Sequence, residues 1–423
     1  MWNFHTVVLD PEKCKGCVTC MKRCPTEAIR VRDGKASVLY DRCIGCGECV
    51  RLCPHSAKLA SYDEFDSIYK FKYKVALPAP SLYGQFNNLT DIDYVLNGLL
   101  ELGFDDVFEV GRGAEYASAV TKILLDQERA KKPVISTACP AVLELILSRY
   151  HNLEENLLNT LAPIDISAKM AREIAEKKAA ESGIKPEEIG LFFISPCPAK
   201  VFALKLGVGV EKPYVDGILS AGDVYMRLVP VMNKLTEIKP LSKLGSVGLR
   251  WATSGGESAA VYRGKYLAAD GIENVKHILN SIEDNTLTEV DFVELNACVS
   301  GCVGGVLNVE NPFVTKARLR ELCSKLPRTN EDILASVGKP LSYYLWEIQP
   351  EWKNFDKIDE DRTLAMKKLM DIEELLSTLP QVDCGMCGAP SCRAFAEDVI
   401  NGVVKDKCPR INEGKKRKKD ENK

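Results

Sequence analysis

The stretch ELNACVSGCVGG (294–305) places two cysteines directly after VDFVEL (290–295), an apolar run typical of a buried parallel strand. STACP (136–140) and SPCPAK (195–200) each place one further cysteine after a similar run. In open parallel sheets, ligands gather at the carboxyl ends of the strands. The three stretches, which lie far apart in the chain, therefore predict that their cysteines converge on one crevice. These are Cys139, Cys197, Cys298 and Cys302.

The surrounding sequence alternates between short apolar runs and amphipathic segments. The runs that predict buried strands are VALPAP (75–80), KPVIST (132–137), GLFFIS (190–195), LGSVGL (244–249) and VDFVEL (290–295). Amphipathic segments such as 91–102 and 168–183 lie between them and predict crossover helices. This alternation is typical of an α/β domain.

The first 62 residues repeat one cysteine spacing, C-x2-C-x2-C-x3-C-P. This is the run of bacterial two-cluster ferredoxins, in which the fourth cysteine ligates the other cluster. The repeat therefore predicts two 4Fe–4S clusters with crossed ligands, whereas a zinc ribbon would need separated pairs. One cluster would be held by Cys14, Cys17, Cys20 and Cys53, and the other by Cys24, Cys43, Cys46 and Cys49.

A further cysteine group lies near the end of the chain, where Cys384, Cys387, Cys392 and Cys408 read C-x2-C-x4-C-x15-C. The glycines beside the first two cysteines permit a sharp turn around a bound group. We expect residues 391–404 to form a helix that carries the chain to the last cysteine. The one remaining thiol, Cys323, lies at helical spacing among apolar residues, so we predict a core position for it.

Composition excludes several classes of function. The chain has 423 residues and a formal net charge of −3, which gives no reason to expect nucleic acid as a partner. We find neither a signal peptide nor an apolar run near the length of a membrane span, so we expect no membrane association and a cytoplasmic location. In a reducing compartment the 17 cysteines persist as thiols or metal ligands, and none of the four histidines lies beside a cysteine pair in zinc spacing.

Almost the entire chain resembles the modular iron-only (FeFe) hydrogenases. In that family the three core motifs read TSCCP, MPCxxKxxE and ExMACxxGCxxGGG, and the three stretches quoted first are similar to them in order. The C-terminal segment resembles a small four-cysteine domain also found in Rnf-complex B subunits and acetyl-CoA synthase gamma subunits. Its presence behind the core is similar to the sensory branch of the family.

The resemblance implies an α/β fold class with a ferredoxin-like two-cluster N-terminal module, a two-lobed α/β hydrogenase core and a small, mostly helical C-terminal 4Fe–4S domain. We expect a two-cluster ferredoxin domain (1–62), a hydrogenase catalytic-type domain (63–351), a helical linker (352–380), a C-terminal 4Fe–4S domain (381–412) and a disordered basic tail (413–423).

The resemblance also implies the cofactors. Besides three accessory 4Fe–4S clusters, it implies an H-cluster, in which a cube on the four core cysteines is bridged to a two-iron subsite with carbon monoxide, cyanide and dithiolate ligands. Cys302 would form the bridge, and Lys200 would hold a metal-bound cyanide through a charge-assisted hydrogen bond. The subsite depends on maturation proteins and can be missing without them. The residues implied to line the cofactor are Ala79, Pro80, Ser81, Ser195, Pro196, Lys200 and Asn296.

Several departures from the family pattern concern proton transfer. The cysteine that donates a proton to the dithiolate amine is replaced by Ala138, whose methyl group cannot relay a proton. Ser195 and Asn296 replace methionines of the second and third motifs. In an ungapped alignment, the relay glutamates of an upstream segment are replaced by Val120, Thr121 and either Ile123 or Leu124. Among the family's acids, Glu294 is retained.

We therefore predict a slow, reversible iron-only hydrogenase, 2 H⁺ + 2 e⁻ ⇌ H₂, that acts in hydrogen or redox sensing. One alternative is a metabolic, ferredoxin-linked hydrogenase with an unfamiliar proton path. Another is a non-catalytic iron–sulfur electron carrier or assembly protein that resembles the Nar family. The expected partners are H₂ and protons, ferredoxin or another redox protein, maturation proteins and a signalling partner, and a homodimer stays open.

Overall fold

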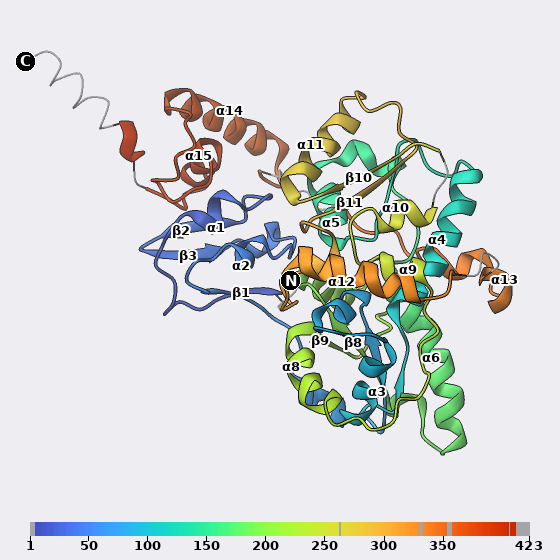
Figure 1. The fold of residues 1–423 in the computed structure, drawn as a ribbon. Coiled ribbons are helices and arrows are strands. Elements are labelled where there is room, and N and C mark those ends of the chain that lie inside the picture. The colour runs from blue at the N-terminus through green and yellow to red at the C-terminus, as the bar shows by residue number, and fades with distance from the viewer. Residues whose placement is uncertain (1–4, 262–263, 330–332, 353–357, 406, 412–423) are drawn as a thin grey trace, which may run out of the picture.

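Two parallel sheets form the centre of the molecule in the computed structural model, which describes residues 5–261, 264–329, 333–352, 358–405 and 407–411 (Figure 1). The predicted basic tail lies outside the described residues, as does part of the predicted linker. Figure 1 shows the N-terminal module and the C-terminal helices side by side on one flank of the two sheets.

The larger sheet has the order β6-β5-β8-β9, with all neighbours parallel. Its strands are β5 (Tyr73–Pro78), β6 (Asp106–Val107), β8 (Ile189–Ser195) and β9 (Gly217–Ser220). Alternate residues of β5 face opposite sides because side chains alternate along a strand. Val75 and Leu77 pack with α4 (Val110–Asp126) and α6 (Pro163–Glu181), whereas Ala76 packs with α3 (Asp93–Glu101) and α8 (Ala221–Met232). The sheet is therefore buried on both faces, as its apolar runs predict.

The smaller sheet has the order β10-β11-β7 and is also parallel. Its strands are β7 (Val134–Ile135), β10 (Tyr266–Asp270) and β11 (Phe292–Asn296). Helices α5 (Pro140–Arg149) and α11 (Ile272–Glu283) pack with it in one core. The remaining helices of the central region are α7 (Pro198–Leu206), α9 (Ser246–Arg250), α10 (Gly256–Val261), α12 (Pro312–Lys325) and α13 (Ile333–Val337).

One of the five predicted strands is wrong. LGSVGL (244–249) lies largely in helix α9, because a short apolar run with glycines does not distinguish a buried strand from a buried helical turn. The Glu115 carboxylate accepts hydrogen bonds from the Gly245 and Gly248 amides, at 2.9 and 3.3 Å, and so satisfies the start of this helix. A Cβ at Gly248 would lie 2.2 Å from the Gly111 carbonyl oxygen, so α9 packs closely on α4.

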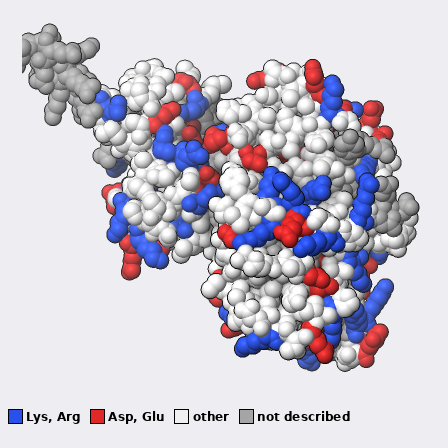
Figure 2. Space-filling model, in the orientation of Figure 1, with Lys and Arg blue, Asp and Glu red and all other residues white. Residues whose placement is uncertain are grey.

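Helix α12 crosses the middle of the molecule in front of the larger sheet (Figure 1). Thr315, Leu319, Leu322 and Cys323 lie on its buried face, which confirms the core position predicted for Cys323. Its lysine and arginine side chains lie on the outside, and Figure 2 shows positive charge gathered over this helix. The helix is thus amphipathic, with a charged outer face.

The N-terminal module consists of two small antiparallel ribbons and two short helices. Strand β1 (Val7–Leu9) pairs with β4 (Lys58–Ala60), and β2 (Ile29–Arg32) pairs with β3 (Lys35–Val38). The helices are α1 (Thr19–Lys22) and α2 (Glu48–Arg51), one in each copy of the cysteine repeat.

The C-terminal region consists mainly of α14 (Arg362–Thr378) and α15 (Cys392–Ile400), which share a small core. A buried ion pair holds this region against the N-terminal module. The Arg30 guanidinium, 2% exposed, lies 2.7 Å from the Asp398 carboxylate, which also pairs with Arg32. The Val31 amide donates to the Gly388 carbonyl at 2.9 Å. Segments more than 350 residues apart are therefore joined by charge and by backbone pairing.

Asp398→Asn should loosen this docking, because it leaves Arg30 buried without a counter-charge. Breaking a buried pair in this way costs about 3–5 kcal/mol. We expect a lower melting temperature in anaerobic thermal unfolding and a larger radius of gyration by X-ray scattering. Asp284→Asn makes the same chemical change at an exposed position and should change neither value. Equal behaviour of the two variants would contradict a structural role for the pair.

Candidate metal centres

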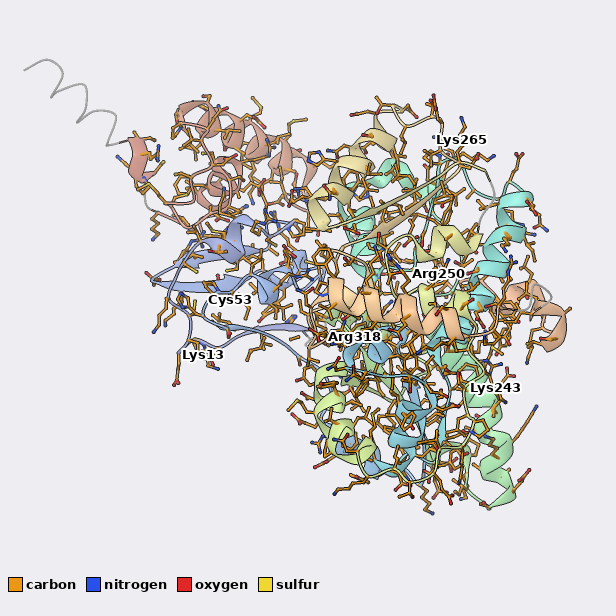
Figure 3. All side chains as sticks on the ribbon, viewed as in Figure 1. Lys13, Cys53, Lys243, Arg250, Lys265 and Arg318 are labelled. Atoms are coloured by element: carbon orange, nitrogen blue, oxygen red, sulfur yellow. The ribbon has the colours of Figure 1, made fainter. Side chains whose placement is uncertain are left out.

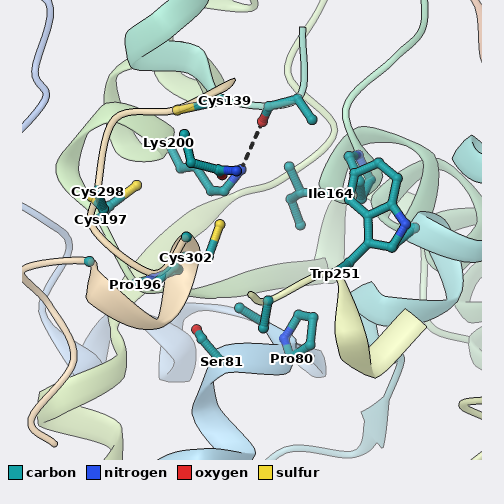
Figure 4. A pocket seen from close by; sticks show the side chains of 18 of the residues that line it. Pro80, Ser81, Cys139, Ile164, Pro196, Cys197, Lys200, Trp251, Cys298 and Cys302 are labelled. Carbon is teal, nitrogen blue, oxygen red and sulfur yellow. Dashed lines mark hydrogen bonds between the residues drawn. The ribbon is translucent and has the colours of Figure 1, made fainter. Parts of the chain in front are cut away.

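The four core cysteines gather around one cavity between the two sheets (Figure 4). Cys139 follows β7 and precedes the first residue of α5, and Cys197 stands in the same position between β8 and α7. Cys298 and Cys302 follow β11. Each cysteine therefore lies just beyond the carboxyl end of a strand. The convergence predicted from the three apolar runs is found in the structure.

Two glycines allow the loop that carries Cys302 to pack closely against Ser254 and against the loop that carries Cys197. Gly301 has a φ of +86°, and a Cβ there would lie 2.5 Å from the Ser254 amide nitrogen. A Cβ at Gly305 would lie 2.2 Å from the Pro196 carbonyl oxygen. A side chain at Gly301 would push this loop away from Ser254, and one at Gly305 would push it away from Pro196, so both glycines help to place Cys302.

The burial of these thiols fits a metal cluster. Burial raises the pKa of Cys298 to about 11 and also raises the pKa values of Cys197 and Cys302. Without a metal the buried sulfurs would stay protonated, whereas iron binds and stabilises the thiolate form. Among the described residues, no three potential ligands lie close enough for a single metal ion.

Lys200 brings a positive charge to the cavity. Its Nζ donates to the Ala138 carbonyl oxygen at 3.3 Å, and Figure 4 shows the side chain lying among the four sulfurs. Burial lowers the pKa of Lys200, but the sulfur charges of Cys302, Cys197 and Cys139 more than offset this, so the pKa lies above its ordinary value. The ammonium is therefore held in its charged form beside the predicted cube.

The other residues predicted to line the cofactor are placed as follows. Ala79, Pro80 and Ser81 line the cavity, as do Pro196 and Asn296. The Ser81 hydroxyl is buried and has no hydrogen-bond partner among the described residues, so a polar group in the cavity would satisfy it. Ser195 is buried and is not among the described residues that line the cavity; its hydroxyl accepts from the Cys197 amide at 3.3 Å and so shapes the cysteine turn.

The residues aligned with the relay glutamates lie away from the cavity. Val120, Thr121 and Leu124 lie on the buried face of α4, and Ile123 on the same helix is partly exposed. The Thr121 hydroxyl donates to the Ala117 carbonyl at 2.8 Å, a bond within the helix. None of these four is among the described residues that line the cavity.

Two buried carboxyl groups also line the cavity, and sequence reasoning singled out one of them, Glu294. The other, Glu257, lies on α10 with both oxygens within 2.8 Å of the Ser136 hydroxyl. Burial, and then the charge of Glu294, raises the pKa of Glu257. Burial also raises the pKa of Glu294, although the Ser258 and Gly255 amides donate to it at 2.8 and 2.9 Å and oppose the rise. No motif in the sequence marks the carboxyl group of Glu257.

The N-terminal module brings its eight cysteines together in two sets that cross between the repeats. Burial and the thiols of Cys17, Cys53 and Cys14 raise the pKa of Cys20, although Lys58 opposes this. Burial and the thiols of Cys24, Cys49 and Cys43 raise the pKa of Cys46. These are the two sets that the ferredoxin spacing predicts. We name them the first set (Cys14, Cys17, Cys20, Cys53) and the second set (Cys24, Cys43, Cys46, Cys49).

The second set lies against the central cavity. A Cβ at Gly47 would lie 2.9 Å from Val306 Cγ2 and 3.2 Å from Pro198 Cγ. Arg51, on α2, donates to the Cys298 sulfur at 3.3 Å and to the Gly304 carbonyl at 2.9 Å. One side chain thus connects the second set with a predicted ligand of the central cube. No motif in the sequence indicates this contact, because Arg51 and Cys298 lie far apart in the chain.

The first set lies against the C-terminal cysteines. A Cβ at Gly385 would lie 3.0 Å from Met21 Cε, and Lys22 donates to the Pro390 carbonyl at 2.8 Å. Lys22 and Arg51 occupy equivalent positions, each two residues after the third cysteine of its repeat. Cys387, Cys392 and Cys408 lie in the core that α14 and α15 share, and the thiols of Cys408 and Cys384 act on the pKa of Cys387. All 17 cysteines are free of disulfides.

Three family models match the chain in the order of its modules. A 4Fe–4S dicluster domain matches residues 6–54, and an Fe–S cluster domain matches residues 379–410. The C-terminal domain of the iron-only hydrogenase large subunit matches residues 72–225 and 220–306, which together span more than half of the chain. The chain belongs to the iron-only hydrogenase family. This membership supports iron–sulfur clusters as the groups that the cysteines hold.

Solved structures of iron-only hydrogenases share the fold. A variant of the [FeFe]-hydrogenase HydA1 from Chlamydomonas reinhardtii is 17% identical, with a TM-score of 0.51 over 67% of this chain and 95% of that one. HydA(deltaEFG), described as revealing stepwise H-cluster assembly, is 16% identical, with a TM-score of 0.50 over 69% and 97%. At such identities the likeness shows the fold alone. It confirms the predicted α/β fold class.

A short segment also resembles proteins from outside the hydrogenases. One component of the ion-translocating oxidoreductase complex is 50% identical over 38 residues in Shewanella sp. strain ANA-3 and 45% identical in Aliivibrio fischeri strain MJ11. The match spans 9% of this chain and 20% of either protein. The chain thus covers a fifth of these curated relatives. In the part of the chain that the structure describes, no helix is long and apolar enough to cross a bilayer.

Cys139→Ala should lower the iron content of chemically reconstituted protein by about a quarter, because one of four predicted cubes loses a ligand. Iron and acid-labile sulfide, measured per chain, test this. Cys323→Ala is the matched control, since Cys323 lies on the buried face of α12 and should leave both contents unchanged. Loss of iron from the control alone would contradict the ligand assignment.

Glu257→Gln should change how stability depends on pH. The unfolded chain ionises this carboxyl near its ordinary pKa of 4.5, whereas the folded chain keeps it protonated to higher pH. Folding therefore takes up a proton in this window, and the free energy of unfolding of the parent falls as pH rises through it, by at most about 1.4 kcal/mol per pH unit.

Glutamine exchanges no proton, so the melting temperature of Glu257→Gln relative to the parent should rise between about pH 5 and about pH 8. Glu289→Gln, at a side chain that is 85% exposed, is the control and should give a flat difference. A flat difference for both variants would show that Glu257 is ionised in the folded protein.

Proposed function

We propose that this chain is a slow, reversible hydrogenase that senses hydrogen or redox state. The observation that carries the proposal is the spatial order of the four cysteine sets, which ends at a cavity where Ala138 stands in place of a proton-donating thiol. The order supports delivery of electrons to the cavity. The methyl group of Ala138 supports slow exchange of protons there.

The residues of the cavity fit an H-cluster. Cys139, Cys197, Cys298 and Cys302 would hold its cube, with Cys302 as the bridge to the two-iron subsite. When bound, this group supplies the metal chemistry that interconverts protons and hydrogen. Lys200 and the unpartnered Ser81 hydroxyl would bind its polar ligands, because both are buried donors that face the cavity.

Electrons would travel along the four sets in their spatial order. The C-terminal set lies beside the first set, the first set interlocks with the second, and the second set touches the central one through Arg51. Arg51 would hold the second set and the central set at a fixed separation, since it bonds to both the Cys298 sulfur and the Gly304 carbonyl. The C-terminal domain would then be the outermost station, where a ferredoxin or another redox partner exchanges electrons.

Protons would need a route that does not use Ala138. Glu257 and Glu294 line the cavity, and Ser136 links Glu257 to the backbone of Ala138, whose amide donates to the Ser136 hydroxyl at 3.3 Å. A carboxyl group with a raised pKa can exchange protons near neutral pH. We propose that Glu257 and Ser136 provide this route, and that it is slower than a thiol placed at residue 138.

Ala138→Cys should raise hydrogen turnover at least about tenfold, because a positioned acid–base group contributes about 10²–10⁴-fold in enzymes. The measurement is hydrogen evolution and uptake by protein matured with a synthetic two-iron cofactor. Ala138→Ser is the matched control, since its hydroxyl has nearly the size of a thiol but is a far weaker acid. No gain in the cysteine variant would mean that the existing route already carries the proton.

Infrared spectra of the matured protein, taken before and after exposure to hydrogen, test the proposal as a whole. Carbon monoxide and cyanide bands that shift under hydrogen would establish a hydrogen-activating site. High specific activity of the parent would favour a metabolic hydrogenase instead of a sensor. If the bands are missing although four cubes are present, the chain is an electron carrier on a hydrogenase scaffold.

A further inference from the structure

Lys58 is a buried charge in the N-terminal module for which the described part of the protein supplies no hydrogen-bond partner. It begins β4, its side chain is 2% exposed, and its Nζ makes no hydrogen bond within the described residues. Lysine is almost never buried this fully unless it is paired, because its ammonium carries a charge and three donors. Its burial therefore calls for an acceptor that the described residues do not provide.

The internal repeat shows that the equivalent position of the other copy is apolar. Both copies continue from the fourth cysteine in the same way, as C-P-x-x-A, and the Ala28 and Ala57 amides donate to the Cys24 and Cys53 sulfurs at the same distance, 3.2 Å. The next residue is Ile29 in the first copy and Lys58 in the second. Both are 2% exposed. Lys58 thus puts an ammonium where the equivalent residue packs a hydrocarbon side chain.

Lys58 lies beside the thiols of the module. It directly follows Ala57, whose amide donates to the Cys53 sulfur of the first set at 3.2 Å. Ala57 packs in one small core with Cys14 and Cys20, which also belong to the first set. Cys24 and Cys49 of the second set are only partly buried against this core. The buried start of β4 is therefore adjacent mainly to the first set.

We infer that Lys58 tunes the cube on the first set. Its ammonium donates hydrogen bonds to the sulfurs of that cube and raises the reduction potential of the cube. The inference rests on one part of the proposed function, that these sets hold cubes. Reduction adds one electron and no proton, so the cube becomes one charge more negative. A buried positive charge stabilises that product more than the oxidised form.

The first set comes directly after the C-terminal set along the proposed electron route. A raised potential makes the first set the place where an electron rests between the C-terminal set and the second set. The protein would then hold one electron in reserve, ready for transfer to the cavity. A lysine that only stabilised β4 would leave the potentials unchanged, so a potential measurement distinguishes the two roles.

The test is a redox titration of the full-length protein, reconstituted with iron and sulfide and followed by electron paramagnetic resonance. In the parent, spins equal to one cube should appear at a higher potential than the rest. Lys58→Met keeps the length of the side chain and removes its charge. We expect reduction of that cube to become at least about tenfold less favourable, which is about 59 mV for one electron. Lys58→Arg retains the charge and should titrate like the parent.

Lys13→Met is the matched control, because Lys13 precedes Cys14 but points outward with a side chain that is 57% exposed, whereas Cys53 lies inside the module (Figure 3). It should leave all potentials unchanged. Iron and sulfide analysis establishes separately that every cube is present, so failure of the cluster assignment is recognised before any titration. If Lys58→Met loses the cube, the titration uses Lys58→Ile instead. This variant introduces the residue found at the equivalent position of the first repeat.

An unchanged titration in a fully loaded Lys58→Met or Lys58→Ile protein would overturn the inference. Loss of the cube in both variants would also overturn it, because Lys58 would then serve cluster assembly. A shift of similar size in Lys13→Met would show that any nearby positive charge has the same effect, and the assignment to Lys58 would fail. Absence of hydrogen turnover bears only on the proposed function.

Discussion

Burial of sulfur charge is the constraint on which the rest of the structure depends. A thiolate in a protein interior is strongly unfavourable unless positive charge lies beside it, and this chain buries thiols in the module and around the central cavity. Iron supplies most of the compensation. The protein adds cations at defined places: Lys200 among the central sulfurs, Arg51 against Cys298, and the buried Lys58 in the N-terminal module. The strands and glycine turns that surround the sulfurs place these cations.

The arrangement separates the two substrates of the proposed reaction. Electrons would enter through a line of cysteine sets that begins at the C-terminal domain, on one flank of the molecule (Figure 1). Protons would enter through the α10 side of the cavity, where Glu257 and Ser136 lie. On this proposal the electron line has all of its cysteines, whereas the proton route would lack the thiol that the family resemblance implies at residue 138. Slow turnover would therefore be set by proton transfer and not by electron transfer.

The sequence predicted what depends on local spacing. Four of five strands were found because they are continuous apolar runs, and the repeat of C-x2-C-x2-C-x3-C-P predicted which thiols meet. LGSVGL was misread because its burial comes from α4 and Glu115, which the run itself does not reveal. Strand β10, with the mixed sequence YLAAD, was missed for a similar reason. The contacts of Arg51, Glu257 and Asp398 join segments far apart in the chain, and such tertiary contacts leave no mark in a single sequence.

The symmetry of the repeat has a consequence for how such proteins can be assembled. Lys22 and Arg51 are equivalent residues, yet one binds the C-terminal domain and the other binds the hydrogenase core. Each half of the module therefore forms its own contact surface, and the internal repeat relates the two surfaces. The domain that packs against one half could be exchanged by changing that half alone, while the other half kept its own contacts. The module works as an adaptor whose two faces can evolve independently.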